Sequence, residues 1–265
     1  MSLNSIETVE LNFNLMGENA PPLIIMHGLF GSARNWQGIA KQLSERFSVY
    51  TLDLRNHGAS PHADSMDYQS MAADVVLFMQ QQNIENAVLL GHSMGGKVAM
   101  QLALTNPEKV NRLIVVDIAP VAYKHNFDEV LMGLYHVPLG SVNSRKEADK
   151  YLAEKISALS LRQFLLQNLV TNNAGGYQWR VNLASIEQSM PAIMGFSEHQ
   201  GEQFTQPSFF INGGKSSYLS VRYRLQAEEL FPQATFKTVE GAGHWPHVES
   251  PADFMSYLNE FLNQQ

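Results

Sequence analysis

Short apolar runs alternate with helix-like stretches along most of this chain, and this alternation limits the fold more than any other feature. The apolar runs span 23–28, 48–54, 86–93, 110–120, 207–214 and 234–244. Stretches with helical spacing lie at 35–47, 67–82, 94–105, 221–231 and 251–264. Because parallel strands need crossover connections, which are usually helices, the alternation predicts an α/β fold. We expect a mostly parallel sheet with helices on both faces.

The alternation stops between residues 121 and 206. Helical and loop patterns follow one another there, including a turn at 172–179, and no convincing strand is visible. A segment of this length is comparable to a small domain. We therefore expect a core formed by residues 1–120 and 207–265, with a helical insertion at 121–206.

Composition narrows the classes of function. The 265 residues, 45% of them hydrophobic, can bury the core of one large α/β domain or of a core with an insertion. The net charge is −7 and no basic patch is visible, which argues against nucleic acid or an anionic membrane surface as partner. The absence of cysteine excludes disulfides, cysteine nucleophiles and thiolate metal sites. No signal peptide and no apolar run of ~20 residues is visible, so we expect a cytoplasmic protein without a membrane span.

The pentapeptide Gly91-His92-Ser93-Met94-Gly95 fits the pattern G-x-S-x-G, between a predicted strand and a predicted helix. An abrupt change from strand to helix strains the backbone at the corner residue, and glycines two positions away avoid a collision. The turn exposes the serine oxygen and aims the N–H of Met94 at a developing negative charge. A plain glycine-rich turn is the alternative, but the strand-and-helix context favours Ser93 as a nucleophile.

A serine hydroxyl needs a base, and His244 is the best candidate. It follows the last predicted strand, in a glycine-rich loop just before the final helix. A loop at that end of the sheet can carry an imidazole to Ser93. His247 is a local competitor. His92 adjoins Ser93, but neighbours on a strand point to opposite sides, so we interpret it as a packing residue.

Four motifs together carry a resemblance to a known family: HGLFGS at 27–32, DLRNHGAS at 53–60, GHSMGG at 91–96 and GAGHWPH at 241–247. In this order they resemble the α/β-hydrolase superfamily over nearly the whole chain. The chain is most similar to small bacterial esterases of the HGLFGS…RNHG…GHSMGGK…DIAP type, some of which act on acyl-CoA thioesters. The resemblance implies an eight-stranded sheet, a helical cap between strands 6 and 7, and a Ser–acid–His triad without metal or cofactor.

The acid is where the chain departs from the family pattern. Its usual place, after the strand at 207–214, contains no Asp or Glu, and Ser216 or Ser217 stands where an aspartate is common. Asp117 ends the preceding strand, where a carboxylate points into the same crevice as the nucleophile. Some α/β-hydrolases place their acid there, so we expect Asp117 to orient His244.

Two other acids are weaker candidates. Glu240 precedes the histidine loop and is the alternative to Asp117. Asp53, which ends another strand, is better interpreted as bracing Arg55 or the loop at 55–60.

The HGLFGS loop and the insertion supply the remaining expected groups. The N–H of Leu29 is the expected second oxyanion donor beside that of Met94, and His27 is expected to hold the loop by hydrogen bonding. Substrate-binding residues are expected to be Phe30, Phe127, Leu134 and Trp245. For Phe127 and Leu134 the alternative is simple packing inside the insertion, and for Trp245 it is packing beside the base.

These residues predict a serine hydrolase for small-molecule carboxylic esters or thioesters with short to medium acyl chains, with acyl-CoA thioesters among the candidates. Carbon–carbon bond hydrolases and lyase-like members share the same scaffold, because reaction class depends on the pocket. A non-catalytic ligand-binding module on this fold is the alternative from another class. The sequence leaves open the acyl group, the leaving group and the oligomeric state.

Overall fold

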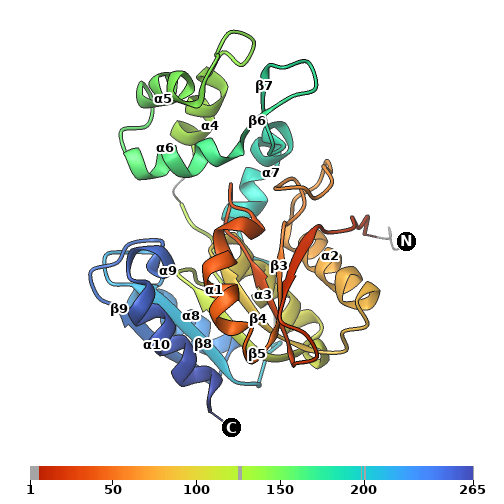
Figure 1. Cartoon of the computed structure of the whole chain (residues 1–265). Coiled ribbons are helices and arrows are strands. Elements are labelled where there is room, and N and C mark those ends of the chain that lie inside the picture. The colour runs from red at the N-terminus through yellow and green to blue at the C-terminus, as the bar shows by residue number, and fades with distance from the viewer. Residues whose placement is uncertain (1–5, 125–126, 198, 200, 265) are drawn as a thin grey trace, which may run out of the picture.

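A seven-stranded sheet forms the centre of the molecule, in the order β1-β3-β2-β4-β5-β8-β9 (Figure 1). The computed structural model describes residues 6–124, 127–197, 199 and 201–264. Only β1 runs antiparallel to its neighbour; the other strands pair in parallel. The strands are β1 (Phe13–Met16), β2 (Pro22–Met26), β3 (Ser48–Leu52), β4 (Ala87–His92), β5 (Val110–Val116), β8 (Ser208–Gly213) and β9 (Ala234–Val239). The predicted α/β fold with a mostly parallel sheet is confirmed.

The sheet has seven strands in the described part of the chain, whereas the resemblance implied eight. The stretch 6–12, which precedes β1, forms no strand. Its backbone amides bond to side chains instead: Val9 N donates to Asp74 Oδ1 at 2.8 Å, and Asn12 N donates to Ser60 Oγ at 2.8 Å. Because these bonds replace a strand ladder, the sheet has one strand fewer than expected. The insertion therefore follows the fifth strand of this sheet rather than the sixth.

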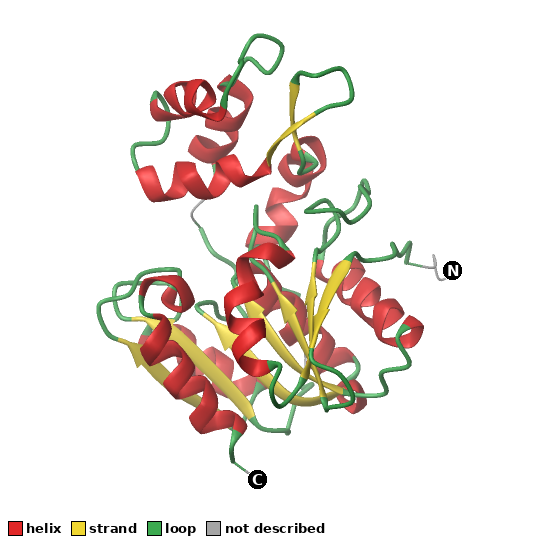
Figure 2. Ribbon diagram, in the orientation of Figure 1, coloured by secondary structure: helices red, strands yellow, loops and turns green. Residues whose placement is uncertain are grey.

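Helices cover both faces of the sheet (Figure 2). On one face α1 (Gln37–Leu43) and α10 (Pro251–Leu262) pack against alternate strand residues such as Leu23 and Ile25. The other face, which includes Ile24 and Met26, is covered by α2 (Tyr68–Gln81), α3 (Met94–Thr105) and α8 (Val221–Leu230). Because side chains alternate between faces along a strand, β2 must be apolar throughout to be buried on both sides.

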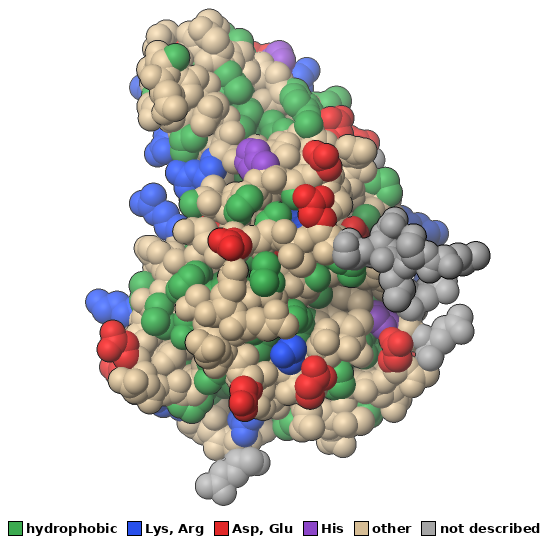
Figure 3. Space-filling view, turned by 90° about the vertical axis from the view of Figure 1, so that its right-hand side faces the viewer, with side chains coloured by type: hydrophobic (Ala, Val, Ile, Leu, Met, Phe, Trp, Pro, Cys, Tyr) green, Lys and Arg blue, Asp and Glu red, His purple; other side chains and the backbone are tan. Residues whose placement is uncertain are grey.

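Shorter elements complete the core: η1 (Ala33–Trp36), η2 (Pro107–Lys109) and α9 (Pro246–Glu249). None of the helices in the described residues is long and apolar enough to cross a membrane. On the face seen in Figure 3, acidic and basic side chains are both scattered over the surface.

The insertion lies between β5 and β8, at the top of Figure 1. It contains α4 (Asp128–His136), α5 (Arg145–Ala153), α6 (Leu159–Leu165), η3 (Leu166–Asn168), β6 (Leu169–Thr171), β7 (Tyr177–Trp179) and α7 (Leu183–Met194). The helical character agrees with expectation, but β6 and β7 form an antiparallel hairpin where no strand was expected. Asn172 stabilises its turn, because Oδ1 accepts the N–H groups of Ala174 and Gly176 at 3.0 Å each. Strands of three residues are too short to show a periodic pattern in the sequence.

Asp53 braces two loops at the carboxyl end of β3. Its Oδ1 accepts the N–H of Ala33 at 2.7 Å, and its Oδ2 accepts the N–H of Ala59 at 2.9 Å. Gly58 passes so close that a Cβ there would lie 2.0 Å from Asp53 Cγ. Of the two roles expected for Asp53, bracing the loop at 55–60 is observed, whereas Arg55 pairs with Asp74.

The ion pair of Arg55 and Asp74 is fully enclosed between the N-terminal stretch and α2. Arg55 Nε lies 2.6 Å from Asp74 Oδ2, and Arg55 Nη2 lies 2.7 Å from Asp74 Oδ1. Burial raises the pKa of Asp74, while the hydrogen bonds from Arg55 and from Val9 N–H act in the opposite direction. The other guanidinium N–H groups donate to Ser65 and to the carbonyl of Glu7.

We expect Arg55→Met to lower the free energy of unfolding by about 3–5 kcal/mol, because it leaves the buried carboxylate of Asp74 unpaired. The double variant Arg55→Met/Asp74→Leu should recover most of this loss. Chemical denaturation followed by circular dichroism measures both. A loss of only about 1 kcal/mol or less in the single variant, roughly the worth of an exposed ion pair, would contradict this account.

Candidate active site

Ser93 is the single residue that connects β4 to α3, and its backbone is strained, with φ 51° and ψ −119°. A Cβ on Gly91 would lie 2.2 Å from the carbonyl oxygen of Gly95, and one on Gly95 would lie 2.4 Å from that of Met26. Only glycine fits at either position. The N–H of Ser93 donates to the carbonyl of Val116 at 2.9 Å, which ties the turn to β5.

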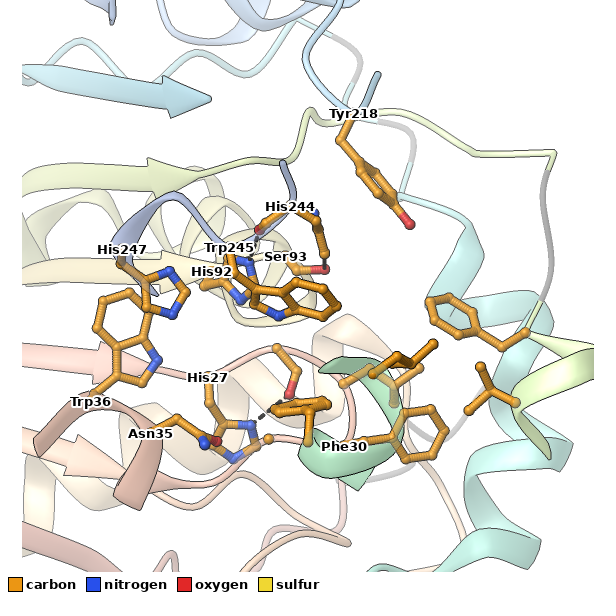
Figure 4. A pocket seen from close by; sticks show the side chains of 17 residues that line it. His27, Phe30, Asn35, Trp36, His92, Ser93, Tyr218, His244, Trp245 and His247 are labelled. Atoms are coloured by element: carbon orange, nitrogen blue, oxygen red, sulfur yellow. Dashed lines mark hydrogen bonds between the residues drawn. The ribbon is translucent and has the colours of Figure 1, made fainter. Parts of the chain in front are cut away.

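Three side chains from distant parts of the sequence form a chain of hydrogen bonds. His244 Nε2 lies 3.1 Å from Ser93 Oγ, and His244 Nδ1 lies 2.6 Å from Asp117 Oδ2 (Figure 4 shows Ser93 and His244). Asp117 directly follows β5, and His244 lies in the loop after β9. A neutral imidazole with its proton on Nδ1 donates to the carboxylate and accepts the serine hydroxyl.

Asp117 is completely buried and accepts two further hydrogen bonds. Gly213 N donates to Oδ1 at 3.0 Å, and Ser216 Oγ donates to Oδ2 at 2.6 Å. Ser216 therefore contributes a donor at the place where the family pattern has its acid. Glu240, the alternative acid, is exposed and does not take this position.

Two groups hold the backbone of the histidine loop. His92 Nε2 lies 2.8 Å from the carbonyl oxygen of His244, so a proton on Nε2 makes His92 a donor. Burial, with the neighbouring imidazoles of His244 and His247, lowers the pKa of His92 and keeps it neutral. Glu249 accepts the N–H groups of Gly243 at 2.8 Å and Trp245 at 3.1 Å, on either side of His244. His92, expected only to pack, thus also bonds to the loop.

His247 does not reach the serine. Its ring stacks on Trp36 with centroids 4.2 Å apart, on the side of the site away from Ser93 (Figure 4). Burial lowers the pKa of His247 to about 3. Tyr218, which the sequence analysis did not single out, stacks on the ring of His244 at 4.3 Å.

Leu29 and Met94 line the small cavity together with Ser93, and within the described residues neither backbone N–H donates to another group. Phe30, with φ 62°, fixes the peptide that follows Leu29. Its N–H donates to His57 Nε2 at 3.0 Å, and its carbonyl accepts Asn168 Nδ2 at 2.8 Å. Burial lowers the pKa of His57 to about 3, so the ring stays a neutral acceptor.

His27 holds the same loop, as expected from the sequence. Its Nδ1 donates to the carbonyl of Gly28 at 2.8 Å, and its Nε2 accepts the N–H of Leu54 at 3.0 Å. The contributions of His57 and Asn168 were not foreseen. The RNHG motif, which contains His57, was the sequence signal that could have identified the contribution of His57.

Two cavities meet at Ser93. The large cavity, about 260 Å³, is lined by Phe30, Phe127 and Trp245 among others (Figure 4). The small cavity, about 20 Å³, is lined by Leu29, Met94 and Phe127 among others. Three of the four expected substrate-binding residues therefore lie at the site.

Leu134, the fourth, lines neither cavity. Its side chain is buried inside the insertion, and its carbonyl accepts the indole N–H of Trp179 at 3.0 Å. The amphipathic pattern of α4 identifies a buried face, but it does not say whether that face meets the insertion or the cavity.

The sequence matches the family model described as alpha/beta hydrolase fold over residues 21–251. It is 40% identical to the sn-1-specific diacylglycerol lipase ABHD11 of Xenopus tropicalis over 98% of this chain and 84% of that protein. It is 34% identical to esterase YbfF of Escherichia coli K12 over 92% of this chain and 94% of that protein. The solved structure of a marine microorganism esterase superposes with a TM-score of 0.93 at 40% identity, covering 96% of this chain and 100% of that one. The chain therefore belongs to the α/β-hydrolase family, among its esterase-like members.

Proposed function

We propose that this protein hydrolyses carboxylic esters through a covalent acyl-enzyme on Ser93. The observation that carries the proposal is the hydrogen-bond chain from Ser93 through His244 to Asp117, next to two backbone N–H groups and two cavities. The esterase and lipase names of its relatives agree with a carboxylesterase-type hydrolase.

The proposed reaction begins when His244 Nε2 takes the proton of Ser93 Oγ and the oxygen attacks the acyl carbon. The N–H groups of Leu29 and Met94 hold the resulting oxyanion. His244 then gives its proton to the leaving oxygen, the C–O bond breaks, and the acyl group stays on Ser93. Water, deprotonated by His244, attacks the acyl-enzyme and restores the serine. Asp117 keeps the proton on Nδ1 in the resting state and stabilises the imidazolium as it forms.

Finer parts of the proposal concern substrate and organisation. Thioesters, including acyl-CoA, would form the same acyl-enzyme, and the acyl group would lie at the short end of the expected short to medium range. The insertion at 121–206 would act as a cap on the core of 1–120 and 207–265, because Val130, Leu161 and Phe164 line the large cavity. A cytoplasmic location remains a prediction from the sequence.

An active-site probe separates this proposal from a non-catalytic ligand-binding module. We expect a fluorophosphonate to form one covalent adduct on Ser93, because only a base-activated serine attacks phosphorus readily. Peptide mass spectrometry locates the adduct, and Ser93→Ala should abolish it. Absence of labelling in the folded parent protein would favour the binding module.

Asp117→Asn should lower kcat by about 10⁴-fold, because an amide favours the wrong histidine tautomer while keeping the shape of the carboxylate. Hydrolysis of p-nitrophenyl acetate measures the loss, and circular dichroism checks the fold. Glu240→Gln, at the alternative acid, is the matched control and should retain parental activity. If Glu240→Gln loses activity and Asp117→Asn retains it, the orienting role belongs to Glu240 instead.

His92→Phe removes the donor to the carbonyl of His244 while keeping a buried ring. We expect kcat to fall by about 10- to 100-fold with a smaller change in KM, because a displaced His244 impairs both proton transfers. His92→Gln retains an N–H donor and should recover part of the activity. If both His92→Phe and His92→Gln keep the kcat of the parent, the bond from His92 has no part in positioning His244.

A further inference from the structure

The two cavities that meet at Ser93 differ in the catalytic groups that line them. Both contain Leu29, Ser93, Phe127 and Tyr218. The lining of the large cavity also includes His244 and Trp245, whereas the described lining of the small cavity includes Met94 and Lys97 but not His244. The two spaces are therefore not equivalent for the reaction.

The chemistry of ester cleavage assigns each space to one part of the substrate. The leaving oxygen must accept a proton from His244 Nε2, so the alcohol part has to occupy the cavity that His244 lines. The acyl group remains bonded to Ser93, with its oxygen toward the N–H groups of Leu29 and Met94. Its chain must then extend away from the leaving group, into the space beside Met94.

We propose that the small cavity is the acyl subsite and the large cavity is the leaving-group subsite, so that the enzyme selects short acyl groups joined to bulky apolar alcohols. The inference rests on the proposed ester hydrolysis and adds the substrate class. The acyl subsite, about 20 Å³, is more than ten times smaller than the leaving-group subsite, so a short acyl group such as acetyl suits it best. The leaving-group subsite, about 260 Å³, has aromatic walls that include Phe30, Phe164 and Trp245.

The acyl subsite is small because the end of α7 is held against α3. Ile193 and Met194, near the end of α7, form one wall of the subsite. The buried amino group of Lys97, on α3, donates to the carbonyls of Met194 at 3.2 Å and Gly195 at 2.5 Å, and burial lowers its pKa to about 7. The hydroxyl of Tyr68 donates to the carbonyl of Ile193 at 2.5 Å.

Widening the subsite by moving α7 would break these three bonds. It would also leave the buried amino group of Lys97 without these acceptors, which is costly. The amino group additionally lies over the rings of Tyr68 and Tyr123, at 5.4 and 4.8 Å from their centroids. The wall is therefore more rigid than an ordinary apolar contact, and a longer acyl chain cannot simply displace it.

Two matched substitutions test the assignment, each removing the same number of carbon atoms from one subsite. Ile193→Ala enlarges the acyl subsite, and Leu161→Ala enlarges the leaving-group subsite. Two substrate series are compared by kcat/KM. The first is p-nitrophenyl esters from acetate to hexanoate, which vary only the acyl chain. The second is acetate esters from methyl to naphthyl acetate, which vary only the alcohol.

For the parent protein we expect kcat/KM to fall by about 100-fold or more from p-nitrophenyl acetate to butyrate, since butyrate has two more methylenes and each one that does not fit costs about 10-fold or more. In the acetate series kcat/KM should be higher for the bulky alcohols than for methyl acetate. Ile193→Ala should raise the butyrate-to-acetate ratio about tenfold and leave the alcohol series unchanged. Leu161→Ala should alter the alcohol series and leave the acyl ratio unchanged.

The opposite pattern, with Ile193→Ala acting on the alcohol series and Leu161→Ala on the acyl series, would reverse the two subsites and overturn the proposal. Flat profiles in a parent protein that hydrolyses esters would overturn it too, while leaving the proposed function intact. No hydrolysis in either series, together with no fluorophosphonate labelling, would instead reject the proposed function. If Ile193→Ala does not fold, Ile193→Val removes one methyl group and should extend tolerance to propionate.

Discussion

At Ser93 the backbone passes from strand to helix within one residue, and the site is built around this turn. Gly91 and Gly95 are confined by the turn's own backbone and by β2, so no side chain fits at either position. The strain at Ser93 is compensated by packing of β4 and α3 in the middle of the sheet, where both elements are almost fully buried. This rigid placement brings the hydroxyl and the N–H of Met94 to the carboxyl ends of the strands, where the loops after β5 and β9 also arrive.

Around that turn, the loops are held mainly by side chains acting on backbone groups. His92 and Glu249 hold the loop of His244. His57 and Asn168 hold Phe30 from two directions, one from the core and one from the insertion. The insertion therefore does more than cover the cavities, because Asn168 acts directly on the loop that carries the N–H of Leu29. Burial lowers the pKa of His57 and of His92, so both remain in the neutral form that these bonds require.

Buried ionisable side chains hold two further pairs of elements together. Arg55 and Asp74 join the loop after β3 to α2 through a bidentate pair, and each also bonds to the N-terminal stretch. Lys97 joins α3 to the end of α7 through backbone carbonyls rather than a carboxylate. Each arrangement tolerates burial because its polar groups are satisfied, and each would be costly to break. The pair of Arg55 and Asp74 stabilises the core, and Lys97 sets the size of the space beside Ser93.

The sequence alone determined the α/β class, the order of the motifs, the turn at Ser93 and the loop that carries His244, because strand periodicity and glycine-rich turns are local properties. It also pointed to Asp117, since the usual acid position at 211–220 contains no carboxylate. Only the tertiary structure decided that the sheet has seven described strands, that Ser216 donates to Asp117, that His92 bonds to the loop of His244, and that Leu134 lies away from the cavities. These features depend on contacts between segments up to 152 positions apart. Such contacts are set by how the elements pack, and no local pattern in the chain records them.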